Sequence, residues 1–158
     1  MGGPGAPHAV KSREGFSRIA RRYDRVNRVL SLGRDGAGRR SASVHLPRGR
    51  VRDLGAGTGA ANREFGERQV VALDPSAPML ALNPASRRVA GYGERLPFAD
   101  ASFDAVFSAL VFRNVDSVPE TLAEVHRVLR PGGAAAVVDL SRPRSGWRRA
   151  LHRLGTAV

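Results

Sequence analysis

The sequence predicts an α/β fold in which a doubly wound, mostly parallel sheet of about five strands follows an N-terminal helix. Two observations support this prediction. From Val51 onward, short apolar runs alternate with segments of helical periodicity, a pattern typical of parallel sheets with helical crossovers. The first two apolar runs each end on an acid, Asp53 and Asp74, and a glycine-rich segment follows the first of them.

The N-terminal part of the chain is predicted to lie outside the sheet. Residues 1–11 have the composition of a disordered tail, and residues 12–46 are expected to form a helical lid segment. Apolar side chains recur there every three or four residues and mark one helical face: Phe16, Ile19, Ala20, Tyr23, Val26, Val29 and Leu30. Gly33, Gly36 and Gly38 are expected to break this helix before the first strand.

Residues 47–158 are predicted to form one domain. Its strands are expected at about 50–54, 69–73, 88–90, 103–109 and 134–140. A weak helix is predicted near 58–67, and a final amphipathic helix around Trp147.

Two further helices have clearer sequence signals. Ser76 is the expected N-cap of a short helix that contains Met79, and Ser117 that of an amphipathic helix over Thr121–Arg130. The predicted inner face of the second helix consists of Leu122, Val125, Val128 and Leu129. The segment Pro131-Gly-Gly133 is expected to end it.

The segment after the first strand carries the main functional signal. It reads Val51-Arg-Asp-Leu-Gly-Ala-Gly-Thr-Gly59, with glycines at alternate positions after Asp53. Without Cβ atoms, such a loop lets a ligand approach the backbone closely. An acid at the end of the next strand, here Asp74, can accept hydrogen bonds from both hydroxyls of a ribose. The combination predicts a site for a nucleoside cofactor.

The glycine spacing favours S-adenosylmethionine over a dinucleotide. The dinucleotide fingerprint is G-x-G-x-x-G, whereas this chain has G-x-G-x-G at Gly55, Gly57 and Gly59. No basic or hydroxyl-rich cradle for a pyrophosphate accompanies the loop. Asp53 would repel a pyrophosphate, but it suits S-adenosylmethionine, which carries a sulfonium and an ammonium group and no phosphate.

Composition and charge limit the other classes of function. The 158 residues carry a net charge of +12, divided into +9 for residues 1–50, −2 for residues 51–120 and +5 for residues 121–158. The basic flanks suit nucleic acid, anionic lipid or an acidic partner, or reflect arginine as the default cation of the chain. The sequence has no membrane-spanning run and no apolar signal core, and it therefore predicts a cytoplasmic protein. It has no cysteine and no histidines at ligand spacing, so no metal site is expected.

Several motifs together resemble the ubiquinone/menaquinone biosynthesis C-methyltransferase family. They are Phe16-Ser-Arg-Ile-Ala-Arg-Arg-Tyr-Asp-Arg-Val-Asn27, the loop at 53–59, Asp74-Pro-Ser-Ala-Pro-Met-Leu80, Gly91-Tyr-Gly-Glu-Arg-Leu-Pro-Phe98, Phe112-Arg-Asn-Val115 and Glu124-Val-His-Arg-Val-Leu-Arg-Pro-Gly-Gly133. The resemblance covers roughly residues 16–143. It implies a Rossmann-like class I methyltransferase that moves a methyl group from S-adenosylmethionine to a ring carbon of a polyprenyl quinol, such as demethylmenaquinol.

The resemblance also implies roles for individual residues. Together with the reasoning from the residues themselves, it gives the following predicted cofactor-binding set: Asp53, Gly55, Gly57, Thr58, Gly59, Asp74, Pro75, Met79, Tyr92, Gly93 and Ser108. In this set Asp74 would hold the ribose, Met79 would pack on the adenine, and Tyr92 and Gly93 would contact its edge. It assigns the methyl-transfer region to Tyr23, Asp24, Asn27, Arg113 and Asn114. These residues would align the reactants and favour the phenolate form of the acceptor.

The chain departs from the family pattern in three places. Tyr92 stands where the family usually has Asp or Asn, so that either stacking would replace a hydrogen bond to the adenine or the adenine would be bound more weakly. The family's serine near the end of the fourth strand falls at Ala109, and Ser108, one residue earlier, would face the other side of the sheet. Family members also continue past position 158 with an antiparallel strand pair beside the fifth strand, which is missing from this chain.

Several alternatives stay open. An unpaired fifth strand invites pairing, so a naturally short chain, a truncated product and a homodimer through that edge are all compatible with the sequence. The function could also be methylation of another small molecule, or cofactor binding without turnover. The basic flanks, with Trp147 and Leu151 as shallow anchors, would allow peripheral contact with an anionic membrane. No nucleic-acid partner is expected, because no recognition motif is present.

Overall fold

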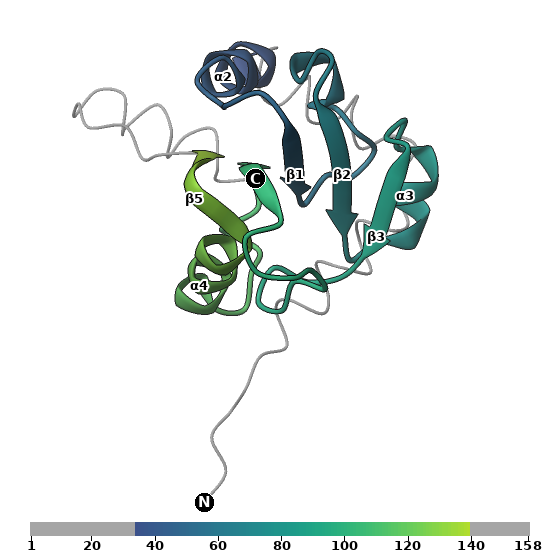
Figure 1. Ribbon diagram of the computed structural model, residues 1–158. Coiled ribbons are helices and arrows are strands. Elements are labelled where there is room, and N and C mark those ends of the chain that lie inside the picture. The colour runs from purple at the N-terminus through teal and green to yellow at the C-terminus, as the bar shows by residue number, and fades with distance from the viewer. Residues whose placement is uncertain (1–33, 140–158) are drawn as a thin grey trace, which may run out of the picture.

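The computed structural model describes residues 34–139, and a five-stranded parallel sheet forms their centre (Figure 1). The strands are β1 Arg50–Leu54, β2 Gln69–Asp74, β3 Arg87–Ala90, β4 Phe103–Ala109 and β5 Leu129–Val138, in the spatial order β3-β2-β1-β4-β5. Every neighbouring pair is parallel. The chain moves outward from β1 in one direction and returns to β4 on its other side. The sheet is therefore doubly wound, which confirms the predicted fold class.

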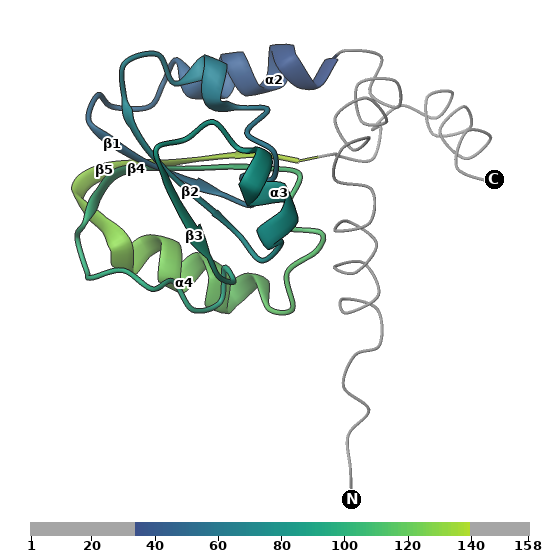
Figure 2. The ribbon, with the colours of Figure 1, turned by 90° about the vertical axis from the view of Figure 1, so that its right-hand side faces the viewer.

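Helices cover both faces of this sheet. They are α2 Arg34–Ser43, the 3-10 turn η1 Asn62–Glu64, α3 Ala77–Leu82 and α4 Val118–Val128. Figure 2 shows α2 on one side of the sheet and α4 on the other. Val70 of β2 packs both against the cluster that includes Phe65, after η1, and against the cluster that includes Leu80 of α3. The segments around η1 and α3 therefore share the α2 face.

The two central strands, β1 and β4, supply much of the buried core. On the α2 face, Val51 and Phe107 pack with Phe65, and the rings of the two phenylalanines meet edge to face at 5.2 Å. On the α4 face, Leu54 packs with Val128. Because both faces of β1 and β4 are packed, the carboxyl ends of these strands are held firmly next to each other.

The helix α2 shows that the prediction of Gly36 and Gly38 as helix-breaking residues was wrong. It runs through Gly36 and Gly38, although each glycine costs a helix about 1 kcal/mol relative to alanine. Tertiary packing offsets this cost. Ala42 packs against the core of the α2 face, and a Cβ on Gly38 would lie 3.4 Å from the side chain of Val138. The small residue therefore lets the helix lie close to β5.

The predicted helix over 121–130 is found with different bounds. Ser117 is its N-cap, as predicted, and its Oγ accepts a hydrogen bond from the Glu120 N–H at 3.3 Å. The helix starts at Val118, and this start turns Thr121 inward and leaves Leu122 48% exposed, so the prediction of Leu122 on the inner face was wrong. Val125 and Val128 are buried, as predicted.

The segment Pro131-Gly-Gly133 does not end α4, which ends at Val128. It lies within β5, where the register with β4 shifts between Phe103 and Ala105 and Gly132 has a φ of +78°. The glycines therefore form an irregularity at the start of the strand, since a residue without Cβ adopts a positive φ without strain.

Two other predictions are changed or untested. The weak helix near 58–67 is reduced to η1, between the glycine loop and Gly66, which has a φ of +57°. The tail at 1–11, the apolar helix over 12–31 and the final helix around Trp147 lie outside the described residues, as does any strand beyond residue 139.

Candidate functional site

The predicted cofactor residues converge at the carboxyl edge of the sheet. Asp53 lies near the end of β1, Asp74 ends β2, and Ser108 lies near the end of β4. These strands are neighbours in the order β2-β1-β4. The chain reverses its winding direction between β1 and β4, and ligands of doubly wound proteins bind at such a point.

The glycine loop is shaped by the protein around it as well as by any ligand. Gly55 has a φ of +67° and Gly59 of +88°, conformations that residues with side chains rarely adopt. A Cβ on Gly55 would collide with the Val111 side chain, and one on Gly59 would lie 2.5 Å from Cδ of Pro84. Local packing therefore requires both glycines. From the sequence alone, the glycines were attributed to the close approach of a ligand.

The middle of the loop is fastened to the segment after β2. The Gly57 N–H donates to Oδ2 of Asp74 at 2.9 Å, and the Gly57 carbonyl accepts from the Asn83 amide at 3.0 Å. Met79 is buried beside them, since a Cβ on Gly57 would lie 3.3 Å from its terminal methyl. Sequence reasoning missed Asn83. The turn-forming Asn83-Pro84 pair was the available signal.

Asp53 is a buried acid with an unsatisfied oxygen. It is only 2% exposed, and its Oδ2 has no hydrogen-bond partner among the described residues. Burial raises the pKa of this carboxyl to about 7, the positive charges of Arg52 and Arg39 oppose the rise, and the negative charge of Asp74 adds to it. A cationic ligand group next to Oδ2 would satisfy the oxygen and stabilise its charge.

Asp74 keeps acceptor capacity for a ligand. Its Oδ1 accepts from the Ser76 N–H at 2.8 Å, and its Oδ2 from the Gly57 N–H. A carboxylate has about four acceptor positions, so roughly two stay available for ribose hydroxyls. Burial raises its pKa, and the two backbone hydrogen bonds oppose that rise. The buried oxygens of Asp53 and Asp74 fit the ammonium and ribose of S-adenosylmethionine.

Gly93 and Ser108 line the α4 side of the same edge. A Cβ on Gly93 would lie 3.0 Å from Thr121 and 3.6 Å from Leu54. Ser108 is paired in register with Leu54, and its buried Oγ has no partner in the described part of the chain. Both residues are therefore on the face opposite Asp53, because neighbouring positions of a strand face opposite sides.

The other predicted cofactor residues lie around these two acids. Thr58 is half-buried in the loop, Pro75 is exposed after β2, and Tyr92 is 48% exposed after β3. Tyr92 forms an isolated bridge with Arg95.

The segment after β4 lies over the glycine loop. Val111 contacts Gly55, as described above, and Leu110 has an unusual positive φ of +61° for a residue with a side chain. The Asn114 amide donates to the Leu110 carbonyl at 3.3 Å, which fixes this predicted catalytic residue near the site. Arg113 is exposed. The structure thus places Arg113 and Asn114, two predicted catalytic residues, in the segment that follows β4 at the carboxyl edge of the sheet, and Tyr23, Asp24 and Asn27 lie outside the described residues.

Comparison with known protein families decides the assignment. Residues 52–137, more than half of the chain, match the model of a methyltransferase domain family. The chain is a methyltransferase of this family.

Sequence relatives indicate to which group of methyltransferases the chain belongs. It is 43% identical over 168 residues to the demethylmenaquinone methyltransferase of Mycolicibacterium gilvum, covering 96% of this chain and 73% of that protein. It is 42% identical over 160 residues to the demethylmenaquinone methyltransferase of Deinococcus radiodurans, covering 89% and 65% respectively. The predicted membership in the ubiquinone/menaquinone C-methyltransferase family is thereby confirmed. The chain spans 60–73% of the length of such relatives.

Solved structures agree on the fold. A methyltransferase from Thermotoga maritima described as S-adenosylmethionine-dependent has a TM-score of 0.70 at 26% identity, covering 87% of this chain and 66% of that one. The cyclase SpnF has a TM-score of 0.71 at 18% identity, which shows a shared fold alone. The methyltransferase family and the Thermotoga maritima structure imply use of S-adenosylmethionine. Within residues 34–139, no helix is long and apolar enough to cross a membrane.

Proposed function

We propose that this methyltransferase binds S-adenosylmethionine at the carboxyl edge of β1, β2 and β4 and methylates a ring carbon of a polyprenyl quinol such as demethylmenaquinol. The observation that carries the cofactor part is the pair of buried acids. Asp53 has an oxygen without a partner, and Asp74 fixes the glycine loop while keeping acceptor capacity. The names of the relatives support the acceptor part.

In this proposal the described residues bind and orient the cofactor, which supplies an electrophilic methyl group on its sulfonium when bound. Asp53 would pair with the ammonium group, and Asp74 would accept hydrogen bonds from the ribose. The buried Met79, which lies against Gly57, would pack on one side of the adenine, and the exposed ring of Tyr92 would stack on it. Holding the sulfonium in a fixed direction is the main contribution of the protein to an in-line displacement.

The acceptor would approach over the segment that follows β4. Arg113 is exposed there, and its guanidinium would stabilise the phenolate that pushes electron density onto the ring carbon. Asn114, fixed by its bond to the Leu110 carbonyl, would orient the acceptor. Tyr23, Asp24 and Asn27 would close the site. The basic flanks would hold the protein at an anionic membrane surface, where a lipophilic quinol resides.

Titration calorimetry with S-adenosylmethionine tests the cofactor part. Wild-type protein should bind, and Asp74→Ala should bind at least about tenfold more weakly because the ribose hydroxyls lose their acceptor. Glu67→Gln is the matched control, since it removes an exposed carboxylate at the opposite edge of the sheet. Absence of binding by folded wild-type protein, or equal affinity of wild type and Asp74→Ala, would refute the proposed site.

Methyl transfer from radiolabelled S-adenosylmethionine tests the acceptor part. Label should enter demethylmenaquinol presented in vesicles, and Arg113→Gln should lower the rate more than it lowers cofactor affinity. Binding of the cofactor without transfer to any quinol would favour the alternative of a cofactor-binding protein without turnover. Transfer only to a small acceptor that is not a quinol would favour the alternative of a methyltransferase that acts on another small molecule.

A further inference from the structure

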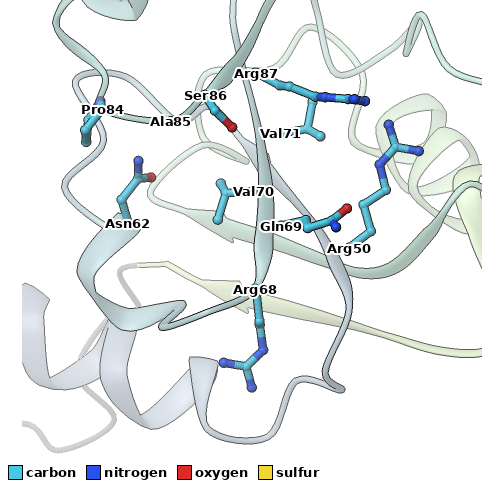
Figure 3. A pocket seen from close by; sticks show the side chains of 10 residues that line it. All are labelled: Arg50, Asn62, Arg68, Gln69, Val70, Val71, Pro84, Ala85, Ser86 and Arg87. Atoms are coloured by element: carbon cyan, nitrogen blue, oxygen red, sulfur yellow. The ribbon is translucent and has the colours of Figure 1, made fainter.

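A cavity lies at the amino edge of the sheet, opposite the proposed cofactor site. It has a volume of about 630 Å³ and is formed where β1, β2 and β3 begin (Figure 3). A second cavity of about 510 Å³ shares three lining residues with it, Arg50, Gln69 and Arg87. Volumes of this size are typical of small-molecule sites. The proposed methyltransferase chemistry uses none of these residues.

Two arginines project from the sheet into this region. Arg50 is paired in register with Gln69, and Arg87 with Val71, two residues further along β2. Because alternate residues of a strand share a face, Arg50, Gln69 and Arg87 project on the same side of the sheet. In Figure 3 the guanidinium groups of Arg50 and Arg87 extend to the same side of the strand that carries Gln69 and Val71.

Neither guanidinium is neutralised by an ion pair within residues 34–139. Arg50 is held in place because its guanidinium carbon lies 5.0 Å from the centre of the Phe103 ring. Arg87 lies on the exposed edge strand β3. Two positive groups that face one region favour an anion that can accept hydrogen bonds from both.

The surrounding charges leave this region positive. Asp104 is already engaged, with Arg130 at 2.7 Å and with the backbone N–H of Arg50 at 2.7 Å. The guanidinium of Arg68 donates to the carbonyls of Leu46, Pro47 and Phe65, so that it adds positive charge without being free to move. The remaining acid in the lining, Glu67, is exposed and borders only the second cavity.

We propose that this amino-edge cavity binds a soluble ligand through a phosphate or diphosphate group, with Arg50 and Arg87 as its two principal contacts. Forked guanidinium groups match phosphate oxygens better than any other side chain does. The Gln69 amide lies between the two arginine positions and adds a neutral donor. S-adenosylmethionine has no phosphate, so this ligand is distinct from the cofactor.

The position of the cavity favours a soluble ligand over a lipid headgroup. The proposed methyl-transfer region lies at the carboxyl edge, whereas Arg50 and Arg87 lie at the amino edge. A membrane bound by these two arginines would face the edge opposite the cofactor site, and a quinol within that membrane would be remote from the reacting methyl group.

Titration calorimetry with inorganic pyrophosphate at constant ionic strength tests the proposal. Wild-type chain should bind, and Arg50→Gln and Arg87→Gln should each bind about tenfold more weakly, the loss expected for one charge-assisted contact. Arg63→Gln removes the same charge from an exposed position that lines neither cavity, and it should stay within about twofold of wild type by the same argument. Thermal unfolding checks that each variant is folded, and Arg87→Gln is safe because its side chain is exposed.

Three results would overturn the proposal. The first is no binding of pyrophosphate by wild type, and the second is an equal loss in Arg63→Gln, which would indicate diffuse attraction to a basic chain. The third is cosedimentation with phosphatidylglycerol vesicles that depends on Arg50 and Arg87 without binding of pyrophosphate. S-adenosylmethionine affinity should be unchanged in Arg87→Gln, so this test can fail while the proposed methyltransferase function stands.

Discussion

At the scale of single residues, Arg52 is in an environment that opposes its charge. It lies in the middle of β1 with 0% of its surface exposed, on the face covered by α4. Its guanidinium donates a hydrogen bond to the Val71 carbonyl at 3.3 Å, while its Nε and one terminal nitrogen have no partner among the described residues. Its guanidinium carbon lies 4.2 Å from the centre of the Phe98 ring. Burial lowers its pKa to about 9, against the opposing effect of Asp53.

We therefore expect Arg52→Met to stabilise the protein. Methionine keeps an unbranched stem against Phe98 and removes a buried charge together with two nitrogens that lack a hydrogen bond, and a buried polar group left without its bond costs about 1–3 kcal/mol. The gain should raise the midpoint of thermal unfolding by several degrees, at about 2–4 °C per kcal/mol for a chain of this size. Arg63→Met, at an exposed position, should change stability by less than about 0.5 kcal/mol. A clear loss of stability in Arg52→Met would show that its ring contact outweighs its burial.

We expect Asp53 to make the affinity for the cofactor depend on pH. Its pKa is raised to about 7, so the carboxyl is increasingly protonated as pH falls below 7. Only the charged form can pair with an ammonium group, and the affinity for S-adenosylmethionine should fall by up to about tenfold per pH unit from pH 7 to pH 5. In Asp53→Asn the affinity should be lower at pH 7 and much less dependent on pH. A pH dependence that is unchanged in Asp53→Asn would assign it to another group, of which Asp74, also raised in pKa, is the first candidate.

At the scale of elements, a glycine can be required for two reasons, a positive φ and close contact with a neighbouring side chain. Two glycines near η1 allow these two reasons to be measured separately. Gly55 has a φ of +67°, and a Cβ there would collide with Val111. Gly66, after η1, has a φ of +57° and nothing within 4 Å of such a Cβ. An alanine would be strained by the positive φ at both positions, but only at position 55 would it collide with a neighbouring side chain. The two positions therefore form a matched pair for substitution.

Substituting alanine at each position should measure both effects. Gly66→Ala should cost about 1 kcal/mol, the strain of a left-handed backbone for an L-residue. Gly55→Ala should cost about 1–3 kcal/mol more, since Val111 and the segment after β4 must move away, and it should also weaken S-adenosylmethionine binding. Urea unfolding gives the stabilities and calorimetry the affinities. Equal losses at the two positions would mean that the segment after β4 adjusts freely and does not constrain the loop.

At the scale of the whole molecule, the parts that were predicted from the sequence are those with a strong local signal. β1 and β4 were placed at their observed bounds, because apolar runs bordered by an acid or by turn residues mark buried strands. The two acids and the glycine spacing predicted the edge of the sheet at which we propose that the cofactor binds. Local patterns could not predict the features that depend on tertiary contacts. The helix α2 forms despite its glycines because it packs on β5, and the side chains of α4 that face the sheet are determined by the start of the helix at Val118.

The same distinction applies to the site. Asp53 and Asp74 could be placed at this edge from the sequence because each lies at or next to the end of a strand, whereas Asn83 acts on the glycine loop from 26 residues away in sequence. Arg52 escaped notice because a charge between apolar neighbours in a short strand is usually read as facing solvent. Its burial depends on the ring of Phe98, which comes from a segment that no local pattern connects to β1.

The core on both faces of the sheet depends on β1 and β4, and the proposed cofactor site lies at the carboxyl ends of these strands. A ligand bound there should therefore stabilise the whole unit. Saturation at one hundred times the dissociation constant adds about 2.7 kcal/mol, which corresponds to a rise of about 5–10 °C in the unfolding midpoint of a chain of this size. Scanning calorimetry should show one transition that moves with S-adenosylmethionine concentration in wild type and Arg87→Gln, but hardly in Asp74→Ala. Two transitions, of which only one responds, would mean that the site belongs to a part of the sheet that unfolds independently.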